Sequence, residues 1–400
     1  MLTYEEARAR ALSDVVPVAA ERVPLASAVG RVLADDVFAR APQPAFDHSA
    51  MDGYAVRAAD LASPGAALPV VGESRTGGGA PPALAEGTCA RIFTGAMMPA
   101  GADAVVMQEA VTREGDVARF AKAARAGEHV RRCGEDVAEG AAVLARGTRV
   151  TPFHVALLAS VEATRVSVAR RPVVSILSTG DELRDAGSPE RPGSVVDANG
   201  PALAALVAMC GGEARALPFA RDDLDATRAA LAGALEQSDL VLTVGGVSVG
   251  DHDVVRAAME GAGVALDFWK VAIKPGKPLC LGRAGRTRVL GLPGNPSSAM
   301  LTFVLFGAPM IRALQGDRVT APAAVEAVLD GEIRHAPGRL EFARVTLDES
   351  GATPVARPLG NQASGAVTSF AWADALALVP LEAGALASGE RVRCWRLRDV

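Results

Sequence analysis

The chain has 400 residues, half of them hydrophobic, so it is too long for a single ordinary core, and about two to four domains are expected. Its formal net charge is −5, and it shows neither a basic stripe nor interleaved aromatic residues, which argues against a nucleic-acid-binding protein. The five cysteines include no Cys-x-x-Cys pair and the five histidines no His-x-x-x-His spacing, so the sequence does not support a zinc or redox centre.

The N-terminal stretch carries a helix signal. Thr3-Tyr-Glu-Glu6 is a capping-box pattern, and the apolar positions that follow it predict a helix through about Leu12. No basic segment followed by an apolar core is present, and the most apolar late stretch, Ala299 to Ile311, is too short to cross a bilayer. We therefore expect a cytoplasmic protein without a membrane span.

Short apolar runs broken by Pro and Gly follow this helix. They extend from Pro42 to Pro82 and recur at Arg91–Ala96 and Ala104–Met107, which predicts a β-rich arm domain over residues 46–132. The flanking residues, 1–45 with 133–170, are expected to form a mixed α/β linking domain. They include a helical stretch from Phe153 to Val161.

Residues 171–318 repeat a pattern of strand, glycine turn and helix. The predicted strands are Val173–Leu177, Leu240–Val244 and Arg288–Leu292, and the predicted helices are Pro201–Met209 and Asp223–Leu235. Continuous apolar strands alternating with helices imply a parallel sheet covered on both faces, that is, a doubly wound α/β domain. The loops after these strands then leave its carboxyl ends, where open α/β sheets place their ligands.

After Pro322 the sequence returns to short alternating segments such as Glu341–Leu347, which predict a small C-terminal β domain over residues 319–400. The predicted fold class is thus multidomain α/β plus β.

Lysine is rare and clustered. The chain has four lysines against thirty-seven arginines, and Lys270, Lys274 and Lys277 fall within eight residues. Lys presents a compact point charge, whereas Arg presents a planar fork, so this segment is suited to a phosphate or another small oxyanion. If Lys270–Lys274 is a strand, its alternation places the ammonium groups of Lys270 and Lys274 on one face. The alternative is a solvated basic stretch on a surface strand.

Asparagine is equally rare. Asn295 precedes Pro296, and Asn199-Gly200 precedes Pro201; a capping residue followed by Pro at the first helical position is a helix-start signature. Exposed amides at helix starts attract anions. Two such starts beside the lysines favour a phosphate pocket, although ordinary capping explains either start by itself.

Acidic residues complete the pattern at the same predicted edge. Asp181-Glu182 follow the first strand, Asp222-Asp223 precede a helix, and Asp251 and Asp253 follow the glycines after the second strand. Carboxylates beside phosphate ligands indicate Mg²⁺, which binds through one or two carboxylates together with phosphate oxygens. Stabilisation of helix N-termini by acidic residues is the alternative, and it explains Asp222 and Asp223 well.

Seven motifs, in this order, resemble the molybdopterin molybdenumtransferases, the family that includes bacterial MoeA and the E domain of gephyrin. The motifs are Ser49–Ala55, Arg91–Ala96, Gly134–Asp136, Ser178–Leu183, Gly245–Ser248, Lys274–Pro278 and Leu292–Pro296. The resemblance covers essentially the whole chain from Tyr4. It implies that the α/β domain binds molybdopterin and that the C-terminal domain is β-barrel-like.

The resemblance implies the last step of molybdenum cofactor synthesis. Adenylylated molybdopterin and molybdate would be the substrates, and AMP would be released in a Mg²⁺-dependent reaction. Positioning and electrostatics would carry most of the catalysis. Because the sulfur ligands of the metal belong to the substrate, the dispersed cysteines are no objection.

The resemblance also assigns residues of the α/β domain. Lys270 and Lys274 would contact phosphates or molybdate, with Lys277 beside them. The expected Mg²⁺ or water-positioning residues are Glu182, Asp222 and Asp253. The expected lining of the phosphate and anion pocket is Gly245, Gly246, Ser248, Pro293, Asn295 and Pro296.

Family members resemble one another in being elongated homodimers whose active cleft lies between two subunits. Asp52, Thr94 and Asp136 would therefore act across the interface, while Arg339, Arg344 and Ser364 of the C-terminal domain would face the pterin or anion. Small-molecule substrates, no nucleic acid and no membrane are expected. Transient contacts with molybdopterin adenylyltransferase and with proteins that mature molybdoenzymes are compatible with the resemblance.

Two other functions remain open. A molybdopterin adenylyltransferase resembles the middle domain alone, and a gephyrin-like binding scaffold would not need the acids and lysines together. Two departures from the family pattern bear on contacts: Val244 stands where a small hydroxyl residue is frequent, and Asp374 replaces a more usual amide.

Overall fold

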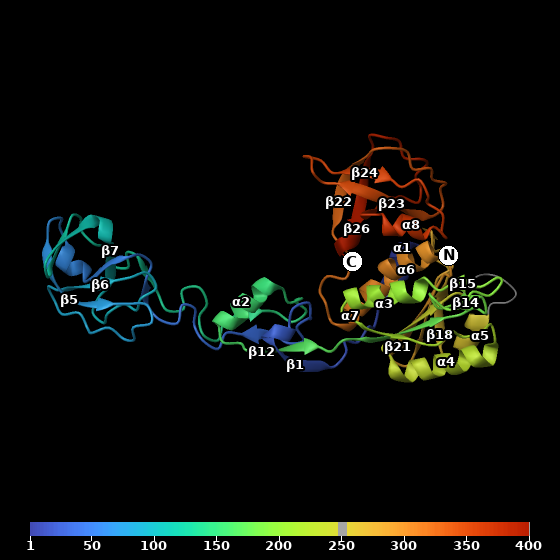
Figure 1. Ribbon diagram of the computed structural model, residues 1–400, viewed down its shortest axis with the longest axis horizontal. Helices are drawn as coiled ribbons and strands as arrows, with labels where there is room; N and C mark the ends of the chain where they lie inside the picture. Colours follow the sequence, from blue (N-terminus) through green and yellow to red (C-terminus); the bar gives the residue numbers. More distant parts are fainter. Residues whose placement is uncertain (247–253, 400) are drawn as a thin grey trace.

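The computed structural model describes residues 1–246 and 254–399. The molecule is elongated: the β-rich arm lies at one end, a linking unit occupies the middle, and the central α/β domain lies at the other end beside the C-terminal domain (Figure 1). Residues 247–253, which include the predicted site residues Ser248 and Asp253, lie outside the described residues.

The linking unit is formed by two short antiparallel ribbons and a helix. Strand β1 (Ala20–Pro24) pairs with β12 (Arg165–Ala169), and β2 (Val37–Phe38) pairs with β11 (Ala142–Leu144). Helix α2 (Pro152–Ser160) closes a core around Leu33, Leu158 and Val166. Thr151 caps α2 and Pro152 occupies its first position, as the helix-start rules expect.

The arm is a six-stranded sheet of order β7-β4-β6-β5-β9-β8. Its strands are β4 (Gly53–Val56), β5 (Ala67–Ser74), β6 (Cys89–Ile92), β7 (Ala104–Met107), β8 (Val111–Glu114) and β9 (Val117–Phe120). The chain enters and leaves the arm through β3 (His48–Ser49), which pairs with β10 (Val130–Arg131). The predicted arm is thus a β-rich unit.

The central sheet has the order β16-β13-β17-β21-β20-β18. Its strands are β13 (Val173–Ser178), β16 (Glu213–Ala216), β17 (Leu240–Val244), β18 (Ala265–Trp269), β20 (Cys280–Ala284) and β21 (Thr287–Leu292). The first four in spatial order are parallel, as predicted. At the other edge β20 runs antiparallel to β21, and β18 runs antiparallel to β20. A small separate ribbon joins β14 (Leu183–Arg184) to β15 (Val195–Val196).

Helices cover both faces of this sheet. Because successive strand residues point to opposite faces, Ile176 and Leu242 pack with α3 (Asn199–Met209), while Leu177 and Val241 pack with α4 (Leu224–Gln237) and α5 (Val254–Gly261). The continuous apolar strand runs therefore follow from burial on both sides.

One long apolar helical segment crosses the core. It comprises α6 (Pro296–Thr302), a π-helical turn η4 (Phe303–Gly307) and α7 (Ala308–Leu314). The turn lies just before Pro309, which has no N–H to donate and therefore disfavours regular α-helical bonding there.

This helical segment is longer than Ala299 to Ile311, the apolar stretch recognised in the sequence. With 19 residues and a mean hydropathy of 1.4, Pro296–Leu314 is by length and composition able to cross a membrane, and Ala299 to Ile311, which alone is too short, is only its middle part. However, 83% of its apolar window is buried inside the protein, which is the environment of a core helix.

The first helix, α1 (Tyr4–Leu12), begins at the predicted capping box: Thr3 Oγ1 accepts from the Glu6 N–H. It packs against η4 and α7 of the central domain, with Tyr4 stacked edge-on against Phe306. Although sequence order groups this helix with the linking unit, its apolar face belongs to the central core.

The C-terminal domain is a closed five-stranded barrel. Around the barrel, β23 (Leu340–Asp348), β24 (Val355–Pro358), β22 (Ala324–Leu329), β26 (Arg391–Arg396) and β25 (Ala375–Val379) pair in turn, and β25 returns to β23. A short helix, α8 (Val367–Ala371), packs against α6. One strand from the central region, β19 (Ile273–Lys274), joins the barrel sheet beside β23.

Candidate functional site

A cavity of about 530 Å³ opens at the carboxyl edge of the central sheet. Strands β13, β17 and β21 are neighbours in the sheet, and the loops that follow all three line the cavity. The cavity lies where the alternating strand and helix pattern predicts a ligand site, and its volume suits a small-molecule ligand.

Two glycines after β17 bring the backbone close to the end of β13. Gly245 and Gly246 have φ values of +90° and +61°, which L side chains rarely adopt. A Cβ at Gly245 would lie 2.9 Å from the Thr179 carbonyl oxygen, and a Cβ at Gly246 would lie within 3.1 Å of Val255 Cβ. These positions therefore require glycine for the cavity wall to close as it does.

Asp197 organises one side of the cavity and was missed by the sequence argument. Its Oδ1 accepts from the N–H groups of Asn199 and Gly200 at 2.9 and 3.0 Å, and its Oδ2 accepts from Ser178 Oγ at 3.0 Å. The prediction that Asn199 caps α3 is wrong: the residue before the helix is Ala198, and Asp197 supplies the capping oxygen. The signal was present, because Asp is a preferred capping residue two positions before Asn199.

The two predicted helix starts do meet at the cavity. Asn199 Nδ2 donates to the Gly294 carbonyl oxygen over 2.7 Å, which ties the start of α3 to the loop before α6. Asn295 occupies the capping position of α6, but its Nδ2 donates instead to Ser364 Oγ of the C-terminal domain over 3.0 Å. The two helix starts and the glycine loop thus meet at one cavity, although Asp197 already accepts from the first amides of α3.

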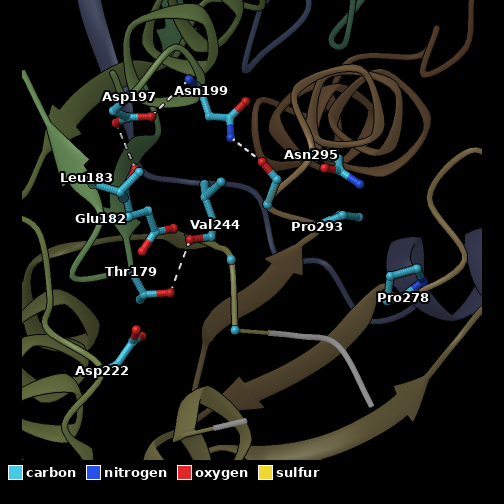
Figure 2. A pocket seen from close by; sticks show the side chains of 15 residues that line it. Thr179, Glu182, Leu183, Asp197, Asn199, Asp222, Val244, Pro278, Pro293 and Asn295 are labelled. Carbon is cyan, nitrogen blue, oxygen red and sulfur yellow. Dashed lines mark hydrogen bonds between the residues drawn. The ribbon is translucent and has the colours of Figure 1, made fainter. Parts of the chain in front are cut away.

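Glu182 and Asp222 are the predicted acids that line the cavity, and both are exposed. Figure 2 shows Glu182 near the middle of the cavity and Asp222 at its margin. Asp222 reaches this edge because the loop after β16 pairs with the end of β13, at Ala220 and Thr179.

The described residues could bind Mg²⁺ only together with phosphate oxygens of a substrate, because they offer too few protein ligands by themselves. Within residues 1–246 and 254–399, no group of three or more His, Cys, Asp or Glu side chains is arranged to hold a metal ion. Asp197 is already engaged by three donors, which leaves Glu182 and Asp222 as open carboxylates in the cavity. Two carboxylates with waters and substrate phosphates are a usual Mg²⁺ environment.

The lysine segment is a loop rather than the predicted strand. Lys270 has a φ of +79°, so β18 ends at Trp269, and the next strand, β19, begins at Ile273. The loop is closed by hydrogen bonds from Lys270 N–H to the Leu279 oxygen and from Val271 N–H to the Lys277 oxygen. The alternation argument that placed Lys270 and Lys274 on one strand face is therefore wrong.

None of the three lysines is among the residues that line the described cavity, but their loop reaches it. Pro278, at the end of this loop, lines the cavity, and Lys277 next to it is exposed. Lys274 Nζ lies 3.0 Å from Glu341 Oε2 of the barrel. Lys270 is half-buried.

The C-terminal domain contributes unequally. Ser364 borders the cavity through its bond to Asn295, and Arg339 is half-buried one residue before β23. Arg344, in contrast, is 1% exposed and donates to Ser369 Oγ and the Ala363 carbonyl oxygen. Arg344 thus stabilises the barrel interior. The expectation that it faces the pterin or the anion is wrong. Pro293 lines the cavity, and Pro296 begins α6 beside it.

The predicted arm residues form a separate group. Thr94 donates to Asp52 Oδ1 through its N–H at 2.8 Å and its Oγ1 at 2.9 Å, and these bonds, the backbone one first, lower the pKa of Asp52. Asp136 lies 3.9 Å from the Arg131 guanidinium in the segment that leaves the arm. None of the three lines the described part of the cavity, because the linking unit separates the arm from the central domain (Figure 1).

Cys89, Cys210 and Cys394 are buried thiols and therefore poor nucleophiles. Burial raises the pKa of the Cys210 thiol to about 11 and of the Cys89 and Cys394 thiols to about 12, so these remain protonated at neutral pH. Cys133 is exposed and lies outside the lining of the described cavity. The chemistry available here is charge stabilisation and positioning.

Comparison with known families divides the chain into three matching regions. Residues 2–161 match the MoeA N-terminal region (domain I and II), residues 175–313 match a probable molybdopterin binding domain, and residues 326–397 match the MoeA C-terminal region (domain IV). These regions together span most of the chain.

Individual relatives match over nearly their full length. The chain is 37% identical to a molybdopterin molybdenumtransferase of Haemophilus influenzae, covering 98% of each chain, and 35% identical to one of Bacillus subtilis, covering 95% of this chain and 90% of the relative. Among solved structures, a molybdopterin biosynthesis MoeA protein of Pyrococcus horikoshii superposes with a TM-score of 0.86 at 31% identity, covering 99% of this chain and all of that one.

Proposed function

Because the chain belongs to the MoeA family, we propose that it is a molybdopterin molybdenumtransferase, which inserts molybdate into adenylylated molybdopterin and releases AMP. The observation that carries this proposal most directly is the three-loop cavity, where two helix starts, a glycine loop and open carboxylates converge. Such a site suits a substrate with a phosphoanhydride.

The cavity residues divide the work of binding and charge stabilisation. The backbone around Gly245 and Gly246 and the loop before α6 would receive phosphate oxygens, whereas the first amides of α3 are held by Asp197. Lys270, Lys274 and Lys277 supply positive charge to the phosphates or to molybdate as negative charge shifts during anhydride cleavage. Ser364, which accepts from Asn295 at the cavity edge, and Arg339 of the C-terminal domain would contact the pterin or the anion.

Glu182 and Asp222 would hold Mg²⁺ against the phosphates, and Asp253, outside the described residues, is the third predicted carboxylate. When bound, the ion would neutralise charge on the phosphate oxygens. A Mg²⁺ requirement is supported by the two open carboxylates, since this cation binds readily through few protein ligands when phosphates complete its shell.

We propose further that two chains form each complete site in an elongated homodimer. Asp52 and Thr94 belong to the arm and Asp136 to the segment that leaves it, and none of the three lines the cavity of their own chain. A second copy that brings its arm to this cavity would supply them. A cytoplasmic location and transient contacts with molybdopterin adenylyltransferase and with molybdoenzyme maturation proteins belong to the same proposal.

The test is a direct assay of the two competing reactions. Purified protein is incubated with adenylylated molybdopterin, molybdate and Mg²⁺, and AMP and dithiolene-bound molybdenum are measured. We expect AMP release that depends on molybdate. Formation of adenylylated product from molybdopterin and ATP, without molybdate-dependent AMP release, would instead support an adenylyltransferase, and inactivity in both assays would favour a binding scaffold.

A further inference from the structure

A buried cluster at the boundary between the central domain and the barrel includes one of the proposed catalytic lysines. Glu341 Oε2 lies 3.0 Å from Lys274 Nζ and 2.7 Å from His335 Nδ1. We propose that Glu341, supported by His335, is the positioning residue that fixes the ammonium group of Lys274 for the transfer reaction. This inference rests on the proposed function, because it assigns Lys274 a role there.

Burial makes this cluster more than a surface ion pair. The side chains of Glu341 and His335 are 4% and 0% exposed, whereas that of Lys274 is 36% exposed. The carboxylate is thus fixed inside the barrel, and the lysine is the member that reaches solvent. Burying an unpaired carboxylate costs free energy, so the ionised Glu341 needs both of its donors. The same two contacts fix the positions of the Lys274 and His335 side chains.

The tautomer of His335 follows from its surroundings. An ionised carboxylate only accepts hydrogen bonds, so Nδ1 donates to Glu341. His335 Nε2 is buried and has no hydrogen-bond partner in the described structure. A neutral ring with its proton on Nδ1 leaves no buried donor unpaired, and Lys274 then provides the positive charge that balances Glu341.

Backbone contacts also fix the position of Lys274. β19 pairs in parallel with β23, with Lys274 directly opposite Glu341. Gly276, two residues later, approaches α6 so closely that a Cβ there would clash with the Thr302 side chain. Lys274 is therefore anchored to the barrel on one side and, through its loop, to helix α6 on the other.

This arrangement gives the barrel a role in catalysis beyond contacting substrate. Placing a catalytic charge wrongly by about 1 Å can cost on the order of a hundredfold in rate. The barrel supplies both the strand and the carboxylate that determine where Lys274 lies. A purely stabilising ion pair would have the same geometry, so the test must separate the two roles.

A double-mutant cycle between Glu341→Gln and Lys274→Ala makes this separation. Gln keeps the shape of Glu341 but removes its charge. If Glu341 acts through Lys274, Glu341→Gln lowers kcat about 10- to 100-fold in the wild-type background. In the Lys274→Ala background it causes less than about a twofold further loss.

Matched variants control for general damage to the barrel. Glu349→Gln removes a carboxylate beyond the far end of β23, where it pairs with Arg396 and Arg398, and should leave kcat within about twofold of wild type. His335→Asn retains a donor near the Nδ1 position, whereas His335→Ala removes it. We expect His335→Asn to retain more activity than His335→Ala.

The outcomes are distinguishable. Independent, additive losses from Glu341→Gln and Lys274→Ala, or an unchanged kcat in Glu341→Gln, would overturn the positioning role. If Glu341→Gln fails to fold by circular dichroism, the same cycle is run with His335→Ala, with the same criterion. Absence of molybdate-dependent AMP release in the wild-type protein would count against the proposed function itself.

A binding readout complements the rate measurements. Equilibrium dialysis of molybdate against the folded variants reports the anion site without turnover. Weaker molybdate binding in Glu341→Gln, with no further weakening in the double variant, supports the inference; equal, additive weakening in both backgrounds contradicts it.

Discussion

The cavity end and the arm end of the molecule both carry proposed site residues, but they differ in completeness. At the cavity, loops from three adjacent strands bring together Glu182, Asp222 and two helix starts. In the arm, Asp52 and Thr94 bind one another on an exposed surface, with no cavity of their own among those described. The contrast teaches that one chain contains a binding cavity and, far from it, the hydrogen-bonded pair Asp52 and Thr94, neither of which lines the described cavity of the same chain.

The largest expected effect is at the cavity. Glu182→Gln or Asp222→Asn removes an open carboxylate, so we expect kcat to fall about 10²- to 10³-fold. Both side chains are exposed, so the melting temperature should change little. Added Mg²⁺ should partly restore Glu182→Gln, as measured by AMP release across a Mg²⁺ titration.

Asp225→Asn is the matched control, since Asp225 is an exposed acid in the first turn of α4 that pairs with Arg228. If this control loses as much activity as the cavity variants, the assignment of Glu182 and Asp222 fails.

A somewhat smaller effect is expected in the arm. Asp52→Asn should lower kcat about 10- to 100-fold even though Asp52 is far from its own cavity, because we assign it to a neighbouring site. Asp116→Asn, at the tip of the β8–β9 turn, should have no effect, since its side chain is 97% exposed and only weakly paired with Arg113. Equal activities for the two variants would remove the arm from the mechanism.

The arm pair also predicts a pH dependence. The Thr94 bonds lower the pKa of Asp52, so the carboxylate stays ionised at lower pH than an ordinary aspartate, and activity that needs it is lost only as pH falls through this depressed pKa. Thr94→Val removes the hydroxyl bond but keeps the N–H bond. We expect the acid limb of the pH–rate profile to move to higher pH; an unmoved limb would contradict this assignment.

A moderate effect on stability is expected where the two regions are joined. Arg149 of the linking unit lies 2.8 Å from Asp317 of the central domain, whose side chain is 5% exposed. Arg149→Gln should lower the free energy of unfolding by about 1–3 kcal/mol, because a nearly buried carboxylate loses its charged partner. Arg228→Gln, which breaks an exposed pair, should cost less in the same denaturant titration.

The smallest effect is expected at Cys133. Cys133→Ser keeps a donor to the Ala45 carbonyl oxygen, and Cys133 lies outside the lining of the described cavity. Activity should remain within about twofold of wild type. Inactivation of the wild-type protein by a thiol reagent, but not of the variant, would show that a cysteine takes part after all.

The same two regions show what the sequence could predict. At the cavity, strand runs followed by glycine, Asn-Pro or acidic turns predicted the three-loop edge, because parallel strands present their carboxyl ends together. The Asn-Gly-Pro pattern predicts a cap at Asn199, whereas the side chain that caps the helix is that of Asp197, two residues earlier.

Other features depend on contacts between distant segments. The strand ends at Lys270, which has a left-handed backbone conformation. The hydrogen bond to the Leu279 oxygen and the close packing of Gly276 determine this conformation, and strand alternation carries no information about either contact. Arg344 lies buried because Ser369 and Ala363 accept its hydrogen bonds across the barrel. The arm residues could be assigned only through family resemblance, since no local pattern tells a tight turn from a surface that completes another site.

The most direct test of the central claim, that a cavity and an arm from different chains form one site, is the activity of a hybrid dimer. Asp222→Asn and Asp52→Asn chains are coexpressed with different tags, and the doubly tagged hybrid is purified. One of its two sites then combines an intact cavity with an intact arm, so we predict about half of the wild-type rate of molybdate-dependent AMP release. A hybrid as inactive as its two parents would contradict the claim.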